Sequence, residues 1–359
     1  MNARWDLLVK LIDSAIKEEI FPSASACVWK RGETVFSYYA GYSQITPIRR
    51  ELKAETLFDL ASLTKPLACG LVMMWFVEQK RFSIDDKLES FFDVPPDKKD
   101  ITVAHLLSHC AGFAAWKPYN LNWQGESGSD FFKTVLSEIL AEPLEYAIGK
   151  GCAYSDLGYI LLLAIVEKAC ETRFDEAFYR VRDMFETPSL IFIRHEHKIL
   201  NIFDFAATED CSWRNRVIVG EVHDENAWAM GGVSAHAGLF GTANDVCRLG
   251  AKLLSIFSGS KGPLKTETVK TFWNYVGAGT YKLAWDSPSL TGSSAGELFS
   301  KKSLGHTGFT GTSIWIDPAR ELVAVLLTNR IHPSRSNEKI REFRPVFHDM
   351  LVKILEGAL

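Results

Sequence analysis

Several kinds of segment are missing from this sequence, and each absence excludes a class of protein. No run of about 18 apolar residues occurs, so we expect no transmembrane helix. Lysine and arginine form no basic stripe of the kind that binds a phosphate backbone, and the formal net charge is −4, so nucleic acid is not an expected partner. Neither the G-x-x-x-x-G-K-[ST] motif nor the G-x-G-x-x-G motif is present, so no nucleotide cofactor is implied.

The first residues also lack the features of a secretion signal. The apolar residues of a predicted helix over 3–19 fall on one face, and Asp6, Lys10 and Asp13 interrupt any continuous apolar stretch. A signal peptide needs an uninterrupted apolar stretch followed by a small-residue cleavage site. We therefore expect a cytoplasmic protein that does not associate with a membrane.

The cysteines form no recognisable framework. The seven of them are scattered, odd in number and without a C-x-x-C pair. This pattern is typical of free, mostly buried thiols in a reducing compartment. Cys69 and Cys152 flank the motifs described below, so a reactive thiol is the alternative at these two positions.

The sequence is rich in what a folded core needs: 47% of its 359 residues are hydrophobic, and they include ten Trp and 23 Phe. Alternating patterns predict a hairpin of strands over 23–29 and 33–39, and β-rich runs cover 304–317 and 322–329. Helices are expected over residues 3–19, 63–79, 102–110, 129–140, 157–169, 242–257 and 338–356. This order predicts an α/β domain built from both ends of the chain, with a helical domain inserted in the middle.

Ser62-Leu63-Thr64-Lys65 places a serine and a lysine three residues apart at the start of a predicted helix. Residues at this spacing share one helical face, so the lysine amine can reach the serine hydroxyl. Unpaired N–H groups and the positive end of the dipole favour an oxyanion at a helix N-terminus. The apolar residues that follow indicate a buried helix, and burial lowers a lysine pKa toward that of a general base. A serine cap followed by a surface lysine is the alternative.

Two further short runs carry polar side chains next to predicted elements. The run 154–156 (Tyr-Ser-Asp) precedes an apolar helix, and Tyr154 is a candidate proton shuttle if a nearby cation lowers its pKa from about 10. The run 306–308 (His-Thr-Gly) begins a β-rich segment. There Gly308 leaves room for a substrate backbone along the strand, and His306 offers a donor, or a cation, for a carboxylate. Each run taken alone also fits an ordinary loop or turn.

The order S-x-x-K, Tyr-Ser-(Asn) and (Lys or His)-Thr-Gly resembles the motifs of the penicillin-binding protein and class C β-lactamase superfamily, which includes D,D-peptidases, D-aminopeptidases and carboxylesterases. The stretches ETLFDLASLTKPL, ITVAHLLSHCAG, YSDLGYILL, GGVSAHAGLFGTANDV and GHTGFTGTSIWIDP extend the likeness over most of the chain. The resemblance implies a β-lactamase/transpeptidase-like fold of the α/β (α+β) class. Such a fold has an antiparallel sheet with flanking helices and an inserted helical domain.

The resemblance also implies a role for each motif residue. Ser62 matches the nucleophile, Lys65 its activator, and Tyr154 the tyrosine that moves the proton during acylation and to the leaving group. The backbone N–H groups of Ser62 and Phe309 match the oxyanion hole. The implied substrate-binding residues are Asp156, His306, Thr307 and Gly308. The implied enzyme is a serine hydrolase that needs no metal and no organic cofactor.

Asp156 departs from the family pattern, which has Asn at this position. Asn can donate a hydrogen bond to a substrate amide carbonyl, whereas an ionised Asp cannot. A carboxylate near Lys65 also raises the lysine pKa and so opposes the effect of burial. Asp156 therefore argues against efficient turnover of β-lactams. Two alternatives stay open: a substrate that presents a donor or an amine, and an Asp kept protonated by burial.

Three other histidine-containing runs are present. The run 195–197 (His-Glu-His) lacks the H-E-x-x-H spacing and has a solvated character, so no metal site is expected there. The run 222–227 (Val-His-Asp-Glu-Asn-Ala) carries an acid and a base side by side, and it fits either a hydrogen-bonded loop or a wall of the cleft. His236 is interpreted as structural.

These observations predict one chain with two domains and a cleft between them. Residues 1–60 and 230–359 form the sheet domain, and residues 61–229 form the mostly helical domain. The expected reaction is acyl transfer to water from a small-molecule or peptide substrate, which is a β-lactam, a D-amino-acid peptide or a carboxylic ester. A cytoplasmic peptidase, amidase or esterase is favoured over a dedicated secreted β-lactamase. A non-catalytic binding or sensor protein with the same fold is the alternative, and the oligomeric state stays open.

Overall fold

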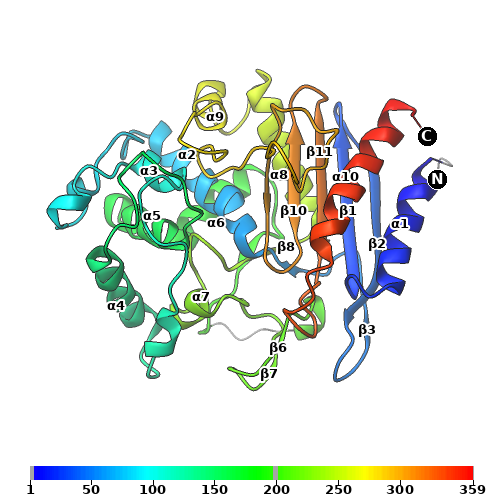
Figure 1. Cartoon of the computed structure of the whole chain (residues 1–359), viewed down its shortest axis with the longest axis horizontal. Coiled ribbons are helices and arrows are strands. Elements are labelled where there is room, and N and C mark those ends of the chain that lie inside the picture. Colours follow the sequence, from blue (N-terminus) through cyan, green and yellow to red (C-terminus); the bar gives the residue numbers. More distant parts are fainter. Residues whose placement is uncertain (1–3, 197–200, 359) are drawn as a thin grey trace.

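The computed structural model describes residues 4–196 and 201–358, and its central feature is a six-stranded antiparallel sheet (Figure 1). Its strands are β1 (Ser23–Lys30), β2 (Glu33–Gln44), β3 (Arg50–Glu51), β9 (Leu304–Thr307), β10 (Ser313–Asp317) and β11 (Leu322–Thr328). The order across the sheet is β3-β2-β1-β11-β10-β9, so strands from the two ends of the chain pair in its middle. β1 and β2 form the expected hairpin, and β1 pairs with β11 so that Cys27 lies opposite Val325.

Helices α1 (Trp5–Lys17), α8 (Ala243–Phe257) and α10 (Ile340–Glu356) cover the two faces of this sheet. On one face of β11, Leu322, Ala324 and Leu326 pack with α1 and α10. On the opposite face, Val323, Val325 and Leu327 pack with α8. Successive side chains of a strand point to opposite faces, so a strand that is buried on both sides is apolar along its whole length. The apolar run that begins at Leu322 is explained by this position.

The middle of the chain forms a helical region beside the sheet (Figure 1). Its centre is α5 (Asp156–Cys170), which is buried without interruption from Leu157 to Val166 and packs against its helical neighbours. A helix that is apolar on every side belongs in a core. The other α-helices are α2 (Leu71–Glu78), α3 (Val103–Leu107), α4 (Gly128–Ala141), α6 (Phe174–Met184), α7 (Glu225–Ala229) and α9 (Thr266–Trp273).

A small sheet of β4 (Phe58–Asp59), β8 (Leu239–Gly241) and β5 (Ile191–Phe192) has β8 in its middle. The pairing of β4 with β8 brings the segment that leads to Ser62 beside the segment that follows His236. This sheet therefore sets the framework of the site. The remaining short elements are β6 (Asp210–Cys211), β7 (Arg216–Val217) and 3-10 helices at Leu88–Ser90, Pro96–Lys98, Tyr119–Asn122 and Ile202–Asp204.

The helix expected after Ser62 is present, but its first turns are not α-helical. A short 3-10 helix, Ala61–Leu63, leads into a π-helix, Lys65–Gly70, and α2 continues from there. Pro66 lacks the N–H that would bond to the Ser62 carbonyl in an α-helix, which favours a wider turn at this point. The other expected helices are confirmed to within a few residues at their ends.

Three further expectations can be compared with the structure. Among the described helices, none has both the length and the apolar surface that crossing a bilayer requires. All seven cysteines are free thiols, as expected. His197 of the run 195–197 lies outside the described residues, and the division of the chain into domains after residues 60 and 229 stays a prediction.

Candidate active site

Ser62 follows a residue with an uncommon backbone conformation. Ala61 has a φ of +47°, a left-handed value that costs a non-glycine residue about 1 kcal/mol or more. The buried carboxylate of Asp59 holds this turn: one oxygen accepts the Ala61 N–H at 2.8 Å, and the other accepts the His223 N–H at 2.7 Å. The turn presents Ser62 at the wall of a cavity of about 540 Å³.

Lys65 lies beneath this cavity with its side chain fully buried. Its Nζ donates to Ser62 Oγ at 3.2 Å, to Asp156 Oδ1 at 2.6 Å and to the His236 carbonyl oxygen at 3.1 Å. Burial lowers the pKa of Lys65, but Asp156 and Tyr154 raise it by more, so the pKa lies above its ordinary value. Of the two opposing effects expected from the sequence, the nearby carboxylate therefore outweighs burial, and Lys65 is not the free base that burial alone would make it.

Tyr154 faces Lys65, whose Nζ lies 4.6 Å from the centre of the tyrosine ring. Its hydroxyl is buried and makes no hydrogen bond among the described residues. Burial raises the pKa of Tyr154 to about 12, although Lys65 lowers it. The hypothesis that a cation lowers this pKa below 10 is wrong, since desolvation of the phenolate is the larger effect. Tyr154 is thus a neutral phenol at neutral pH.

The run 306–308 lies at the end of β9 on another wall of the cavity. The Nδ1–H of His306 donates to the Thr307 carbonyl oxygen at 2.9 Å, and burial, followed by the charge of Lys65, lowers the pKa of His306 to about 3. His306 is therefore a neutral imidazole, and the alternative of a cationic His306 is wrong. A Cβ on Gly308 would overlap Thr312 Oγ1 and lie 2.6 Å from the Leu60 carbonyl oxygen. The absence of a side chain allows β9 to approach the turn before Ser62.

The backbone N–H groups of Ser62 and Phe309, which are the expected oxyanion hole, make no hydrogen bond to any described residue. Both residues line the cavity. The carbonyl groups around Phe309 are held in place: Arg330 Nε donates to the Phe309 oxygen at 2.9 Å, and Arg344 Nη2 donates to the Gly308 oxygen at 2.9 Å. The two free N–H groups are therefore on fixed backbone, as a preorganised pair of donors requires.

All the site residues expected from the sequence line the cavity, except Lys65. Lys65 is buried beneath it and donates hydrogen bonds to two of the lining residues, Ser62 and Asp156. The expected residues that line the cavity are Ser62, Tyr154, Asp156, His306, Thr307, Gly308 and Phe309. The remaining lining residues include Trp116, His223, Asp224, Glu225, His236, Tyr281, Asp286, Arg330, Arg335, Arg341 and Arg344.

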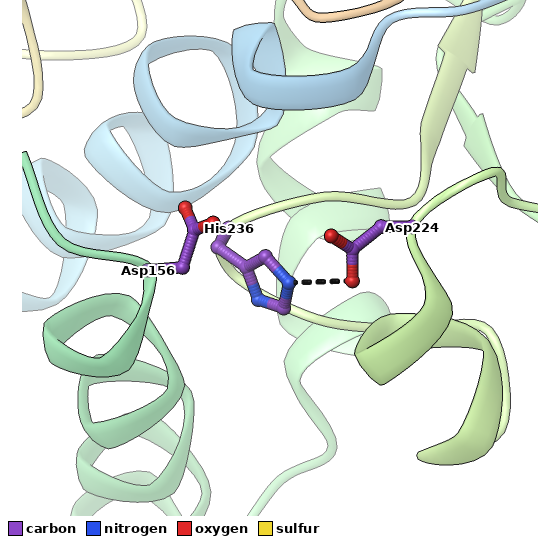
Figure 2. A group of neighbouring side chains, drawn as sticks. All are labelled: Asp156, Asp224 and His236. Atoms are coloured by element: carbon purple, nitrogen blue, oxygen red, sulfur yellow. Dashed lines mark hydrogen bonds and ion pairs between the residues drawn. The ribbon is translucent and has the colours of Figure 1, made fainter. Parts of the chain in front are cut away.

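Asp224 belongs to the run that the sequence left open between a hydrogen-bonded loop and a wall of the cleft, whereas His236 was interpreted as structural, and both line the cavity. His236 Nε2 lies 2.9 Å from Asp224 Oδ1, and both face Asp156 (Figure 2). One ligand-type atom from each of the three lies within 4.8 Å of the others. The cavity lining supports the cleft-wall alternative for the run 222–227, and the interpretation of His236 as structural did not anticipate its place on the cavity wall.

This geometry also bears on whether the three residues suit a metal ion. Asp156 already accepts a short hydrogen bond from the buried ammonium of Lys65. Lys65 balances one of the two carboxylate charges, so a divalent cation at this site would bring one more positive charge than the remaining carboxylate can balance. We therefore assign no metal to these residues.

Comparison with known proteins agrees with the fold. A sequence profile of the family described as Beta-lactamase matches residues 8–345. The "Putative D-alanyl-D-alanine carboxypeptidase" of Salmonella enteritidis is 31% identical to this chain over 373 aligned positions, which cover 92% of this chain and 84% of the relative.

Similar solved structures include SurE bound to D-Leu, with a TM-score of 0.74, 20% identity and coverage of 100% of this chain and 77% of SurE. They also include EstCE1, described as a hydrolase with promiscuous acyltransferase activity, with a TM-score of 0.72, 21% identity and coverage of 95% and 98%. A third is the octameric penicillin-binding protein homologue from Pyrococcus abyssi, with a TM-score of 0.72, 19% identity and coverage of 99% and 78%.

The fold and the site define a serine hydrolase of the kind that includes penicillin-binding proteins and β-lactamases. The chain belongs to the beta-lactamase family, and its antiparallel sheet with surrounding helices is the β-lactamase/transpeptidase-like fold. The expected family and fold class are confirmed.

Proposed function

We propose that this protein hydrolyses an amide or ester carbonyl through an acyl-enzyme intermediate on Ser62. The observation that carries the proposal is the position of Lys65 Nζ, 3.2 Å from Ser62 Oγ and 2.6 Å from Asp156 Oδ1. A nucleophile in hydrogen-bond contact with a base that a third group orients is the arrangement expected for covalent catalysis. In this role Lys65 and Asp156 act as one unit.

The proposed acylation step moves one proton through this unit. Lys65 donates a proton to Asp156 and takes the hydroxyl proton of Ser62 as Ser62 Oγ attacks the carbonyl carbon. The developing oxyanion accepts hydrogen bonds from the N–H groups of Ser62 and Phe309. The route requires no free amine in the resting protein, which agrees with the raised pKa of Lys65.

Collapse of the tetrahedral intermediate requires a proton for the leaving group. Tyr154 holds a proton at neutral pH because its pKa is about 12, and its hydroxyl has no hydrogen-bond partner among the described residues. We propose that it donates this proton to the leaving nitrogen or oxygen and recovers one from Lys65. Attack by water on the acyl-enzyme then releases the acid and regenerates Ser62.

The proposed substrate class is a small molecule or peptide with an amide, peptide or ester bond. The names of a carboxypeptidase relative and of a hydrolase with a similar fold support this range. Thr307 lies at the end of β9 on the cavity wall, where it can contact a bound substrate, and Gly308 holds this end of the strand close to Ser62.

The first experiment is intact-mass spectrometry after incubation with p-nitrophenyl acetate and, separately, with a penicillin, on the wild type and on Ser62→Ala. We expect an acyl adduct on the wild type that decays with turnover of the ester, and no adduct on Ser62→Ala. A stable adduct without turnover would favour a binding or sensor protein. Equal ester turnover by folded Ser62→Ala would exclude Ser62 as the nucleophile.

A further inference from the structure

We propose that Asp156 and Asp224 form an ammonium-binding subsite, so that the preferred substrates carry a protonated amine close to the carbonyl that Ser62 attacks. This inference rests on the proposed function, because it names the substrate class of the same site. Both carboxylates line the cavity that contains Ser62, and they approach each other from different parts of the chain, Asp156 from the start of α5 and Asp224 from the start of α7 (Figure 2).

Each of these carboxylates has one oxygen that is already bonded and one that is not. Asp156 Oδ1 accepts from Lys65 Nζ, whereas Asp224 Oδ1 accepts the Ala227 N–H at 2.8 Å and the His236 Nε2–H at 2.9 Å. Neither Oδ2 accepts a hydrogen bond from any described residue. Two carboxylate oxygens are thus available to donors that enter the cavity.

The charge balance of the pair leaves a negative excess when His236 is neutral. Lys65 balances the charge of Asp156. Asp224 has only the Ala227 N–H and His236, whose Nδ1 lies 2.7 Å from Ser234 Oγ, so both ring nitrogens of His236 are engaged. Burial raises the pKa of Asp224, but His236 and the Ala227 N–H lower it by more, so this carboxylate is ionised at neutral pH. A buried charge of this kind is stabilised by a cation.

A tight turn of the chain places His236 against Asp224. Gly232 has a φ of +94°, and a Cβ at this position would overlap the Ile193 carbonyl oxygen. Only glycine fits such a turn, and it directs the following segment back across the start of α7. The geometry of Asp224 is therefore built into the fold rather than left to a flexible side chain.

A second feature of the cavity also points to a polar ligand. The buried hydroxyl of Tyr154, on the same cavity wall, has no hydrogen-bond partner among the described residues. Buried polar groups are nearly always paired, so this hydroxyl is suited to a group of the bound substrate. An ammonium group has three donors and no acceptor, which matches the acceptor oxygens of Asp156 and Asp224.

The arginines of the cavity are committed to other partners and do not neutralise Asp224. Arg344 donates to backbone oxygens of Gly308 and Thr312, and Arg335 pairs with Glu209 and Glu225. Glu225 therefore offers a matched control: it lines the same cavity and follows Asp224 in the sequence, but its charge is paired.

The test compares alanine p-nitroanilide with its N-acetyl derivative, in both D and L forms, at pH 7.0, where the free α-amine is largely protonated. We expect wild-type kcat/KM to be at least about 10-fold higher for a free-amine substrate than for its N-acetyl derivative. Asp224→Asn should abolish this preference, mainly through a higher KM for the free-amine substrate, so that the loss of kcat/KM on this substrate exceeds the loss on the N-acetyl substrate and on p-nitrophenyl acetate by at least about 10-fold. Glu225→Gln should retain the preference.

Turnover of p-nitrophenyl acetate by the wild type separates this inference from the proposed function. No ester turnover and no acyl adduct would overturn the proposed function. Ester turnover without preference for the free amine, or an equal loss on all three substrates in Asp224→Asn, would overturn the subsite alone. If neither anilide is cleaved, competitive inhibition of ester hydrolysis by alaninamide, against N-acetylalaninamide, decides the question. Inhibition that is not selective for the amine overturns the subsite.

Discussion

Two buried polar groups, Lys65 and Tyr154, govern the proton chemistry at the scale of single residues. Burial alone would make Lys65 a better base and Tyr154 a poorer acid. The carboxylate of Asp156 reverses the first effect, so the pKa of Lys65 is raised, while burial prevails at Tyr154 and its pKa is about 12. Both groups are therefore protonated in the resting protein. Lys65 has Ser62 and Asp156 as hydrogen-bond partners, whereas the hydroxyl of Tyr154 has none among the described residues.

The variant Asp156→Asn tests the link between Asp156 and Lys65. It removes the group that raises the pKa of Lys65 and leaves burial, which lowers it. In the proposed route Asp156 takes the proton of Lys65, so the kcat/KM of Asp156→Asn for p-nitrophenyl acetate should fall by about 10²-fold or more at neutral pH, and the remaining activity should rise with pH as Lys65 loses its own proton. A rate and a pH profile equal to those of the wild type would show that Asp156 takes no proton in the reaction.

The variant Tyr154→Phe tests the proposed proton donor. The hydroxyl has no hydrogen bond to lose among the described residues, so its removal should leave the melting temperature unchanged or slightly raised. The kcat/KM for an amide substrate should fall by about 10²- to 10⁴-fold, because general acid catalysis is lost. A loss smaller than 10-fold on an amide, in a variant of normal stability, would assign the proton transfer to another group.

At the scale of elements, the site depends on the close approach of β9 to the turn before Ser62. Gly308 allows this contact, since a Cβ there would overlap Thr312 Oγ1 and crowd the Leu60 carbonyl. The variant Gly308→Ala should lower the free energy of unfolding by about 1–3 kcal/mol, as overpacking does. It should also lower kcat/KM for p-nitrophenyl acetate by at least 10-fold, because the Phe309 N–H is displaced.

Gly158 provides the control for that substitution. It lies within α5, and a Cβ there would have no neighbour closer than 3.6 Å, an ordinary van der Waals distance. Urea unfolding and ester turnover of Gly158→Ala should therefore match those of the wild type or show a slightly higher stability. Similar losses in Gly158→Ala and Gly308→Ala would indicate that close packing at Gly308 has no particular part in the site.

Local patterns account for much of the fold and for part of the site. The three-residue spacing of Ser62 and Lys65 predicted their contact, because it needs only one turn of helix. The sequence indicated two opposing effects on the pKa of Lys65 but not which is larger, because that depends on the distance to Asp156, 91 positions away in the chain. The low pKa of His306 was not predictable, because it depends on burial in the folded protein and on the charge of Lys65. The pairing of Asp224 with His236 was missed for a similar reason: the chain must first turn back at glycines.

At the scale of the whole molecule, the two ends of the chain meet in one sheet, and burying that sheet on both faces also buries histidines. His348 on α10 is fully buried, and its Nδ1–H donates to the Ser294 carbonyl oxygen at 2.8 Å. Burial lowers the pKa of His348 to about 4. The hydrogen bond to Ser294 opposes this effect, and the positive charge of Arg344 adds to it. His306 has a pKa of about 3 for the same principal reason.

These depressed values predict that the protein loses stability in acid. Between about pH 6.5 and pH 4 the unfolded chain binds a proton at position 348 and the native protein does not, so stability falls as the pH falls. The free energy of unfolding should drop by about 1.4 kcal/mol per pH unit for this histidine. His348→Asn keeps a donor for Ser294 but cannot titrate. The difference in free energy of unfolding between the wild type and this variant, measured with urea, should shrink by about 2 kcal/mol from pH 7 to pH 5. Parallel losses in the two proteins would mean that His348 is not the group that takes up the proton.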